Sequence, residues 1–521
     1  MLSNSVFRLA RPRKKGWMHL LFSRFILIVA LLLLQLGLAA GFFFFLREYI
    51  PAFAVAMTVF TIGMVLYLFN CPMDVDGKLT WMFLIAVAPV GASLLLFFTR
   101  SNTGHRRIRR RVETLVEQTK TAIPQDPAVM EELRAADVNT AALVRYLNRS
   151  GCFPAYRHTA AAYLPGGESM LRELLKEIDR AERFIFLEFF ILEEGDLWGR
   201  VLQKLIEKAK AGVEVRVLYD GTCEISRLPG NYCALLREQG IRAKAFAPIR
   251  PIVSSHYNYR DHRKIAVIDG RVAFTGGVNL ADEYINGVNL FGHWKDAAVM
   301  LRGEAVKSFT LMFLQSWNIN EKEPVFAPWL EDAPEAPDAA GFVIPYGDCP
   351  LDGDLVGETV YMDILNRARD YVHIMTPYLI LDGKMESALC FAAQRGVDVK
   401  IILPGRPDKK LAYALAKSHY HTLLEAGVKI CEYSPGFVHA KVVVSDAVRA
   451  VVGTINLDYR SFYHHFECAA YLLGTDFIAD IDEDFQETLM QCRTVTGETM
   501  RRERLFYRIV GPLFKFIAPL M

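Results

Sequence analysis

The feature that most constrains the fold of this chain is an internal repeat, in which two long segments show the same order of sequence patterns. Each segment has a strand-like apolar run, a stretch with helical spacing and a second, alternating strand. The runs lie at 183–192, 197–211 and 213–219 in the first segment, and at 371–380, 385–395 and 397–403 in the second. Gly212 and Gly396 end the helical stretches directly before the next strand, as C-terminal caps do. This order predicts parallel crossovers, and therefore an α/β fold made of two similar halves.

Chain length and a proline-rich stretch divide the sequence further. A chain of 521 residues is expected to form two or three domains beside any membrane part. The stretch 323–340 carries four prolines and is predicted to connect the two halves. We expect a membrane anchor at 1–112, a linker at 113–151, a first half at 152–330 and a second half at 341–521.

Each half contains one copy of the same motif, H-x-K followed after four further residues by aspartate. The copies consist of His262, Lys264 and Asp269, and of His439, Lys441 and Asp446. In both copies the motif opens an apolar strand. Because alternate residues of a strand share a face, each histidine and its lysine are predicted to point into one site. The return strand ends in small residues and an amide, which is Asn279 in the first copy and Asn456 in the second.

These residue types are the groups that exchange of a phosphodiester requires. The reaction needs a nucleophile for phosphorus, a proton donor for the leaving alkoxide, and donors for the equatorial oxygens. Histidine suits the first two roles because its pKa lies near working pH, and lysine and asparagine suit the third. A single H-x-K is typical of a surface strand, whereas two copies in matching contexts indicate a site. The lysines take the electrostatic role of a metal ion, so no metal and no cofactor is predicted.

The remaining cysteines and histidines show no metal-binding pattern. Nine cysteines are scattered without a C-x-x-C pair, which predicts reduced thiols and no zinc site. Four histidines near the motifs are expected to be neighbours of the site or surface residues: His256, His293, His464 and His465. His419 and His421 have ligand-like spacing on a predicted helix, for which a solvated helix face is favoured over a metal.

The paired motifs, each followed by glycine and asparagine, resemble the signature of the phospholipase D superfamily from about residue 152 to the C-terminus. The apolar N-terminal segments, the TPYL run at 376–379 and the GTINLDYRSF run at 453–462 resemble bacterial cardiolipin synthases in particular. The resemblance implies two phospholipase D-like α/β sandwich halves packed together, preceded by N-terminal transmembrane helices. It also implies that one motif histidine forms a phosphohistidine and the other protonates the leaving alcohol. The sequence leaves open which histidine attacks.

The resemblance gives the acidic residues separate roles. It agrees with the expectation that the motif aspartates, Asp269 and Asp446, form turns, and it implies that carboxylates on the strand beyond each motif orient the histidines. Asp296 and Glu467 are the candidates, and aligning the two runs by their histidines leaves Asp296 one position away from Glu467.

For function, the resemblance implies transfer of a phosphatidyl group between two phosphatidylglycerol molecules with release of glycerol. A hydrolytic membrane phospholipase D, another phosphatidyltransferase and a non-catalytic lipid-binding scaffold are the alternatives. Both motifs are complete, which disfavours the scaffold. A net charge of +2, with basic clusters placed beside apolar segments, indicates membrane lipids and no nucleic acid as partners. The sequence does not indicate an oligomeric state.

Three apolar stretches, at 25–46, 50–70 and 79–99, are each long enough to cross a bilayer. Two or three membrane helices are therefore expected, in a multi-pass protein of the plasma membrane with a cytoplasmic catalytic part. Arginine and lysine flank the stretches on both sides, which would place both flanks in the cytoplasm, although three crossings would separate them. The basic and apolar segment at 501–517 is either an interfacial segment or a terminal helix packed on the body.

Overall fold

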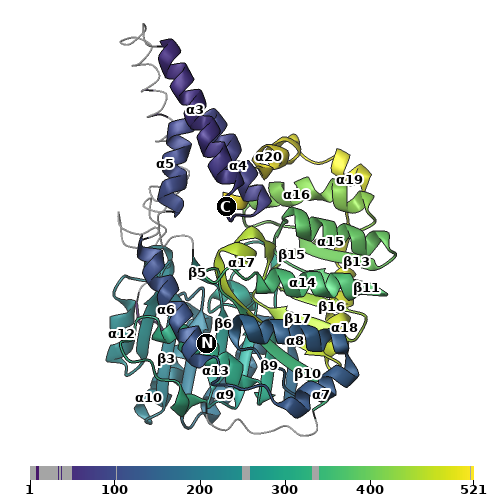
Figure 1. Ribbon diagram of the computed structural model, residues 1–521. Helices are drawn as coiled ribbons and strands as arrows, with labels where there is room; N and C mark the ends of the chain where they lie inside the picture. Colours follow the sequence, from purple (N-terminus) through teal and green to yellow (C-terminus); the bar gives the residue numbers. More distant parts are fainter. Residues whose placement is uncertain are drawn as a thin grey trace.

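The computed structural model describes residues 7–10, 33, 37, 50–100, 103–248, 259–330, 339–516 and 518–520. Its body contains two large mixed β-sheets flanked by helices, and a helical N-terminal part projects from one end (Figure 1). The first sheet has the order β1-β9-β7-β6-β2-β3-β4, and the second has the order β10-β19-β17-β16-β11-β13-β14-β20. The two orders correspond strand by strand up to β4 and β14, and β20 adds one edge strand.

The strands of the first sheet are β1 (Thr159–Pro165), β2 (Phe184–Phe189), β3 (Glu214–Asp220), β4 (Arg242–Phe246), β6 (Lys264–Ile268), β7 (Val272–Gly276) and β9 (Ala297–Gly303). Those of the second are β10 (Phe342–Asp348), β11 (Tyr371–Met375), β13 (Asp398–Pro404), β14 (Lys429–Tyr433), β16 (Val442–Ser445), β17 (Arg449–Gly453), β19 (His465–Leu473) and β20 (Cys492–Thr494). In each sheet three consecutive strands, β2-β3-β4 or β11-β13-β14, are parallel and the remaining pairings are antiparallel.

The helices of the first half include α9 (Gly167–Arg180), α10 (Asp196–Lys210), α12 (Tyr232–Glu238) and α13 (Val306–Asn318). Those of the second include α14 (Val356–Arg367), α15 (Gly383–Gln394), α16 (Lys410–Glu425), α17 (Tyr459–Tyr463) and α18 (Ile478–Leu489). The predicted crossover helices correspond to α10 and α15, and the glycines that follow them have the left-handed backbone expected of caps, with φ of 93° at Gly212 and 97° at Gly396.

The strands that correspond to the first apolar run of each half, β2 and β11, are shorter than those runs suggest. The run at 371–380 splits into β11 and a separate two-residue strand, β12 (Leu379–Ile380), which pairs with β18 (Leu457–Asp458) outside the main sheet. Pro377 lies between the two pieces and has no backbone N–H to donate to a ladder, which explains the break. The predicted strand at 183–192 likewise ends at Phe189.

The segment expected to be a linker, 113–151, is helical instead. It contains the end of α6 (Thr103–Thr119), then α7 (Pro127–Ala136) and α8 (Val138–Gly151). Leu133, Val144 and Leu147 of this segment are fully buried in a hydrophobic core that also contains residues of both sheets. Burial of these side chains joins the segment to the body, and the same core runs across the interface between the two halves.

Among the described residues, one helix is long and apolar enough to cross a membrane: the 19 residues Pro51–Phe69 of α3 (Ile50–Phe69). The predicted stretch at 79–99 is not one span, because the chain breaks at Ala88 and Pro89 into α4 (Val75–Val87) and α5 (Pro89–Arg100), of 13 and 12 residues. The stretch at 25–46 lies outside the described residues apart from 33 and 37. The described part of the chain thus contains one candidate membrane helix, and the expectation of two or three is not confirmed there.

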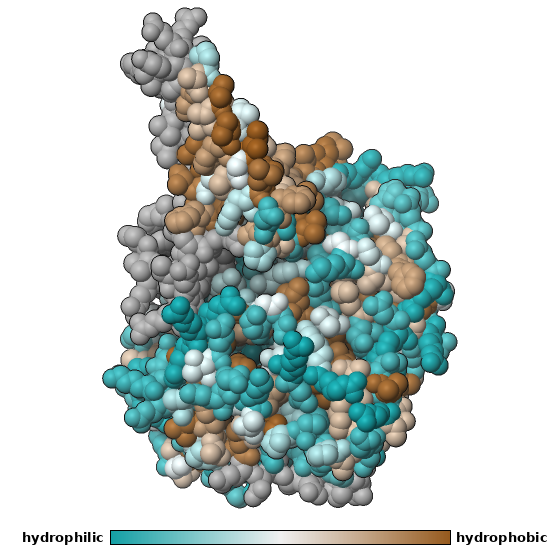
Figure 2. Space-filling model, viewed as in Figure 1, coloured by the Kyte–Doolittle hydropathy of each residue, from teal (hydrophilic) through white to brown (hydrophobic). Residues whose placement is uncertain are grey.

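The C-terminal helix α20 (Leu505–Lys515) combines the two interpretations of its sequence. It packs on α16, where a Cβ on Gly511 would lie 2.3 Å from the carbonyl oxygen of Ala414. Its other face exposes large apolar side chains, namely Leu505, Phe506, Ile509 and Leu513. Figure 2 shows this apolar surface beside the apolar surface of α3 and α4. We call the exposed apolar residues of α3, α4 and α20 the apolar face.

Candidate active site

The two halves pair with each other through the short strands that directly precede the motif histidines in sequence. The two-residue strand β5 (Arg260–Asp261) pairs in parallel with the start of β19, and β15 (Gly436–Val438) pairs in parallel with β8 (His293–Lys295). The backbone N–H of His262 donates to the carbonyl oxygen of Phe466 at 2.9 Å, and that of His439 donates to the carbonyl oxygen of Lys295 at 2.7 Å. Each motif histidine is therefore held by the half that does not contain it.

The orienting carboxylates follow the same crosswise arrangement. Nδ1 of His262 lies 2.9 Å and 3.0 Å from the carboxylate oxygens of Glu467 in the second half. Nδ1 of His439 lies 2.8 Å from Oδ2 of Asp296 in the first half. In both rings the carboxylate occupies Nδ1, so Nε2 is the nitrogen left for the reaction.

Asp296 and Glu467 occupy equivalent positions in the two sheets. Asp296 lies two residues before Ala298, which pairs with Gly276, and Glu467 lies two residues before Ala469, which pairs with Gly453. The one-residue offset that arises from aligning the neighbouring histidines therefore disappears when strand register is used. Sequence alone does not show this register, because an extra residue before either carboxylate leaves the apolar pattern unchanged.

The small residue after each return strand makes room for the carboxylate. A Cβ on Gly277 would lie 2.0 Å from Oδ1 of Asp296 and 2.8 Å from the carbonyl oxygen of His439. Thr454 takes the corresponding place in the second half, and its hydroxyl donates to Glu467. A larger side chain at position 277 would displace the carboxylate that anchors the ring of His439.

Both motif lysines are buried beside their histidines. Nζ of Lys264 donates to the carbonyl oxygen of His262 at 2.5 Å. Nζ of Lys441 donates to the carbonyl oxygen of His439 and lies 2.9 Å from its Nδ1. Burial lowers the pKa of Lys264 to about 8 although Glu467 opposes it, and burial lowers the pKa of Lys441 to about 7 although Asp296 opposes it. The site thus places two buried amines beside the imidazoles, where their protonated forms can bind an anion.

The charges of each motif influence the imidazole of the other. Burial, followed by the charges of Lys264 and Lys441, holds the pKa of His262 well below its usual range. Burial and Lys441 lower the pKa of His439 to about 4, against the influence of Asp296, and Lys264 of the other half contributes to the decrease. The pKa of each imidazole is therefore lowered in part by the lysine of the opposite half. A bound phosphodiester would add negative charge between them and raise both imidazole pKa values.

The two asparagines lie near the motifs but are held by protein groups. Oδ1 of Asn279 accepts the N–H of Ile191 at 2.9 Å, and its Nδ2 donates to the hydroxyl of Tyr284 at 2.7 Å. The Nδ2 group has a second N–H, so phosphate binding by Asn279 stays a prediction. Nδ2 of Asn456 lies 3.3 Å from Oδ2 of Asp458, which leaves its amide more weakly held.

The motif aspartates form turns. Asp269 and Asp446 have left-handed backbones, with φ of 54° and 56°. The carboxylate of Asp269 accepts the backbone N–H groups of residues 182–184, and that of Asp446 accepts those of residues 369–371. Asp269 follows the far end of the five-residue strand that begins at Lys264, about 16 Å away at roughly 3.3 Å per residue. The expectation that the motif aspartates form turns is therefore confirmed, and their part in the motif is structural and not catalytic.

The other histidines differ in position. His465 lies beside His262, with ring centroids 5.2 Å apart, and is buried. His293 accepts or donates a hydrogen bond of 3.0 Å with the hydroxyl of Tyr433. His419 is buried and bonded to Glu386, so the solvated face expected for it is wrong. His421 is exposed and pairs with Glu425, while His256 lies outside the described residues.

One nitrogen each from His262 and His465 and one oxygen of Glu467 lie within 4.8 Å of one another, which is close enough for a metal ion. Sequence reasoning expected His465 to be a neighbour of the site or a surface residue, and the structure places it beside the site. Its alternation with Glu467 on one strand face carries no motif that would have given it a closer role.

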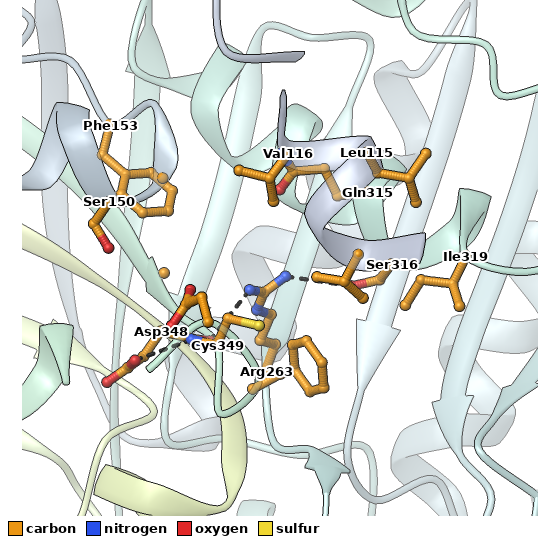
Figure 3. Close-up of a pocket in the computed structure, with 15 residues that line it drawn as sticks. Leu115, Val116, Ser150, Phe153, Arg263, Gln315, Ser316, Ile319, Asp348 and Cys349 are labelled. Atoms are coloured by element: carbon orange, nitrogen blue, oxygen red, sulfur yellow. Dashed lines mark hydrogen bonds between the residues drawn. The ribbon is translucent and has the colours of Figure 1, made fainter. Parts of the chain in front are cut away.

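Figure 3 shows a pocket that is lined by Arg263, Ser316 and Asp348, among other residues. The guanidinium of Arg263 donates to the carbonyl oxygen of Glu467 at 3.1 Å and to the hydroxyl of Ser316 at 3.3 Å. It also reaches the carbonyl oxygen of Asp348 at 3.5 Å. Arg263 thus links the strand that carries Glu467 to the first half. The motif imidazoles do not line this pocket.

Comparison with known proteins identifies the family. A family model described as "Cardiolipin synthase, PLD-like domain" matches residues 174–308 and 361–489. An uncharacterized protein of Streptococcus mutans is 53% identical over 88% of this chain and 100% of its own length. Cardiolipin synthase 2 of Bacillus cereus is 34% identical over 89% of this chain and 90% of its own. The crystal structure of phosphatidylserine synthase from Haemophilus influenzae Rd KW20 matches with a TM-score of 0.56 at 14% identity, over 73% of this chain and 97% of its own, which shows a shared fold.

Two matching sheets joined at paired H-x-K motifs define an enzyme of the phospholipase D-type phosphatidyltransferase class. Within this class the chain belongs to the bacterial cardiolipin synthase family of the phospholipase D superfamily.

Proposed function

We propose that this chain transfers a phosphatidyl group from one phosphatidylglycerol molecule to another through a phosphohistidine, and releases glycerol. The observation that carries the proposal is the crosswise anchoring of His262 and His439, each by a carboxylate of the opposite half. Together with Lys264 and Lys441 they supply a site with two buried imidazoles and two buried amines. The catalytic unit comprises the halves at 152–330 and 341–521.

In the first step, Nε2 of one histidine forms a bond to phosphorus while the bond from phosphorus to the glycerol oxygen breaks. The other histidine, protonated at Nε2 because the bound phosphodiester raises its pKa, donates this proton to that oxygen. In the second step, a hydroxyl group of the second phosphatidylglycerol gives its proton to that same histidine as its oxygen attacks phosphorus and the phosphorus–nitrogen bond breaks. The lysines stabilise the negative equatorial oxygens. One phosphodiester replaces another, so no nucleotide is consumed.

The roles of the two histidines are not distinguished by their anchors, because both rings present Nε2 and both have a carboxylate at Nδ1. The expected association of the protein with a membrane supports the choice of a lipid substrate. The apolar face and the basic residues of the C-terminal segment favour association with an anionic bilayer, with the catalytic halves in the cytoplasm.

The test is lipid analysis with the full chain reconstituted in phosphatidylglycerol vesicles. Mass spectrometry is expected to detect cardiolipin and free glycerol in equal amounts. His262→Ala and His439→Ala are each expected to lower turnover by about a thousandfold or more, since the reaction loses a bonding partner or a proton donor. His421→Ala, which changes an exposed histidine paired with Glu425, is the matched control and should keep normal turnover. Phosphatidic acid as the sole product at every glycerol concentration would establish hydrolysis instead.

A further inference from the structure

His465 is a buried imidazole that the proposed reaction does not use. It begins β19, where its backbone pairs with Arg260, and it is 6% exposed. Neither ring nitrogen has a hydrogen-bond partner among the residues that the structure describes. Its Nδ1 lies 3.6 Å from an oxygen of Glu467, which is beyond hydrogen-bond distance. A buried polar ring without partners is unfavourable, and such groups in proteins commonly bind a ligand or water.

The ring lies against the reactive centre. Its centroid is 5.2 Å from that of His262 and 6.3 Å from that of Phe190. One nitrogen of His465, one nitrogen of His262 and one oxygen of Glu467 lie within 4.8 Å of one another. A single oxygen atom can bridge two such groups with hydrogen bonds of about 2.8 Å each. The arrangement therefore suits a small polar group bound between the imidazoles.

The charge state of His465 determines which kind of ligand group its ring can bind. Burial lowers its pKa to about 3, although Glu467 acts in the opposite direction. The ring is thus neutral at working pH and offers one N–H donor and one nitrogen acceptor. That pair complements a hydroxyl group, which also donates once and accepts, better than it complements a carboxylate or an ammonium group.

We propose that His465 binds a hydroxyl group of the acceptor alcohol, the one adjacent to the hydroxyl that attacks phosphorus. The proposal rests on the proposed phosphohistidine reaction. A vicinal diol, such as a glycerol headgroup, can place one hydroxyl at phosphorus and the other at His465. Water and a monohydric alcohol have no second hydroxyl and lose this anchor. His465 therefore favours transfer to a diol over hydrolysis at the second step, and the proton of the attacking hydroxyl still passes to the catalytic histidine.

The experiment measures how one phosphohistidine divides between two acceptors. Full-length enzyme in vesicles of phosphatidylglycerol diluted with phosphatidylcholine is given 1,2-propanediol, and the ratio of phosphatidylpropanediol to phosphatidic acid is measured. Both products come from the same intermediate, so the ratio does not depend on how much of a variant is folded. His465→Leu is expected to lower the ratio about tenfold, the effect of one hydrogen bond, and His465→Asn to restore most of it. His464→Leu, which changes the preceding residue, is the matched control and should leave the ratio unchanged.

Ethanol has no second hydroxyl, so it distinguishes loss of the hydrogen bond to His465 from a general disturbance of the active site. The ratio of phosphatidylethanol to phosphatidic acid should be nearly the same in His465→Leu and the unmodified chain. Equal decreases with ethanol and with the diol, or no decrease with either, would overturn the proposal. A ratio that changes on addition of EDTA would also overturn it, in favour of a cation held by His262, His465 and Glu467.

The outcomes also separate this inference from the proposed function. An unmodified enzyme that makes phosphatidylpropanediol but no cardiolipin would refute phosphatidylglycerol as acceptor and leave the role of His465 standing. Cardiolipin synthesis with an unaltered ratio in His465→Leu would refute only the role of His465. Hydrolysis alone in the presence of every diol would refute both.

Discussion

Replacing Lys441 by methionine is expected to stabilise the protein while it abolishes phosphatidyl transfer. Lys441 is 1% exposed, and burial lowers its pKa from 10.5 to about 7. A group whose pKa is lowered on folding makes the folded state less stable at low pH, and the deficit disappears as the pH rises towards the unfolded value. For this shift the deficit is about 5 kcal/mol at pH 6, about 4 kcal/mol at pH 7 and about 2 kcal/mol at pH 9.

Methionine has a similar length and no charge, so Lys441→Met removes the deficit. It also removes the hydrogen bond to the carbonyl oxygen of His439, which offsets about 1 to 2 kcal/mol of the gain. A net gain of about 2 to 3 kcal/mol at pH 7 follows, equivalent to a rise of a few degrees in Tm. Loss of the cation at phosphorus should lower turnover by at least about a hundredfold.

The assay is thermal unfolding of the detergent-solubilised chain, followed by tryptophan fluorescence at pH 6, 7 and 9. Lys264→Met, with a pKa lowered to about 8, should give a smaller gain. Lys429→Met, an exposed lysine 2.7 Å from Asp398, is the control and should change stability by less than about 0.5 kcal/mol. A Tm for Lys441→Met below that of the unmodified chain at pH 7, or a difference that does not shrink towards pH 9, would refute the reasoning.

Three further predictions concern the site and the turn that Asp269 forms. Asp296→Asn should lower the rate about 10- to 100-fold or more through loss of the charged hydrogen bond to His439, measured as initial cardiolipin formation per folded molecule; an unchanged rate would contradict the anchoring role. The pH profile of kcat/KM should fall above about pH 7, where Lys441 loses its proton. Lys441→Arg should move the alkaline limb to higher pH. A limb that stays in place would exclude Lys441 as the group whose deprotonation causes the fall. Asp269→Ala should lower Tm by leaving three backbone N–H groups unbonded while the products per folded molecule stay the same, and altered products would place it in the chemistry.

Local patterns in the sequence were sufficient for the parts of the fold that depend on neighbouring residues. The crossover helices α10 and α15, their capping glycines and the turn aspartates follow from periodicity and backbone preference, and the structure places them as expected. The break at Pro89 was also visible in the sequence, since proline lacks the N–H that a continuous helix needs. Hydropathy alone does not show this break, because the residues on both sides of it are apolar.

The crosswise pairing of histidines and carboxylates could not be predicted in the same way. It depends on β5 of the first half pairing with β19 of the second, a contact between segments about 200 residues apart. The equivalence of Asp296 and Glu467 depends on strand register, and the amide of Asn279 is occupied by Ile191 and Tyr284. Such partners are set by tertiary packing and leave no local pattern.

The central claim is that the two motif histidines act on one phosphorus atom. The most direct test is to mix the enzyme with phosphatidylglycerol, quench within a turnover under alkaline conditions that preserve phosphohistidine, and locate the adduct by peptide mass spectrometry. We expect one phosphatidyl group per chain on His262 or His439, and loss of both adduct and turnover when that histidine is replaced by alanine. An adduct on any other residue, or full turnover in both alanine variants, would contradict the account.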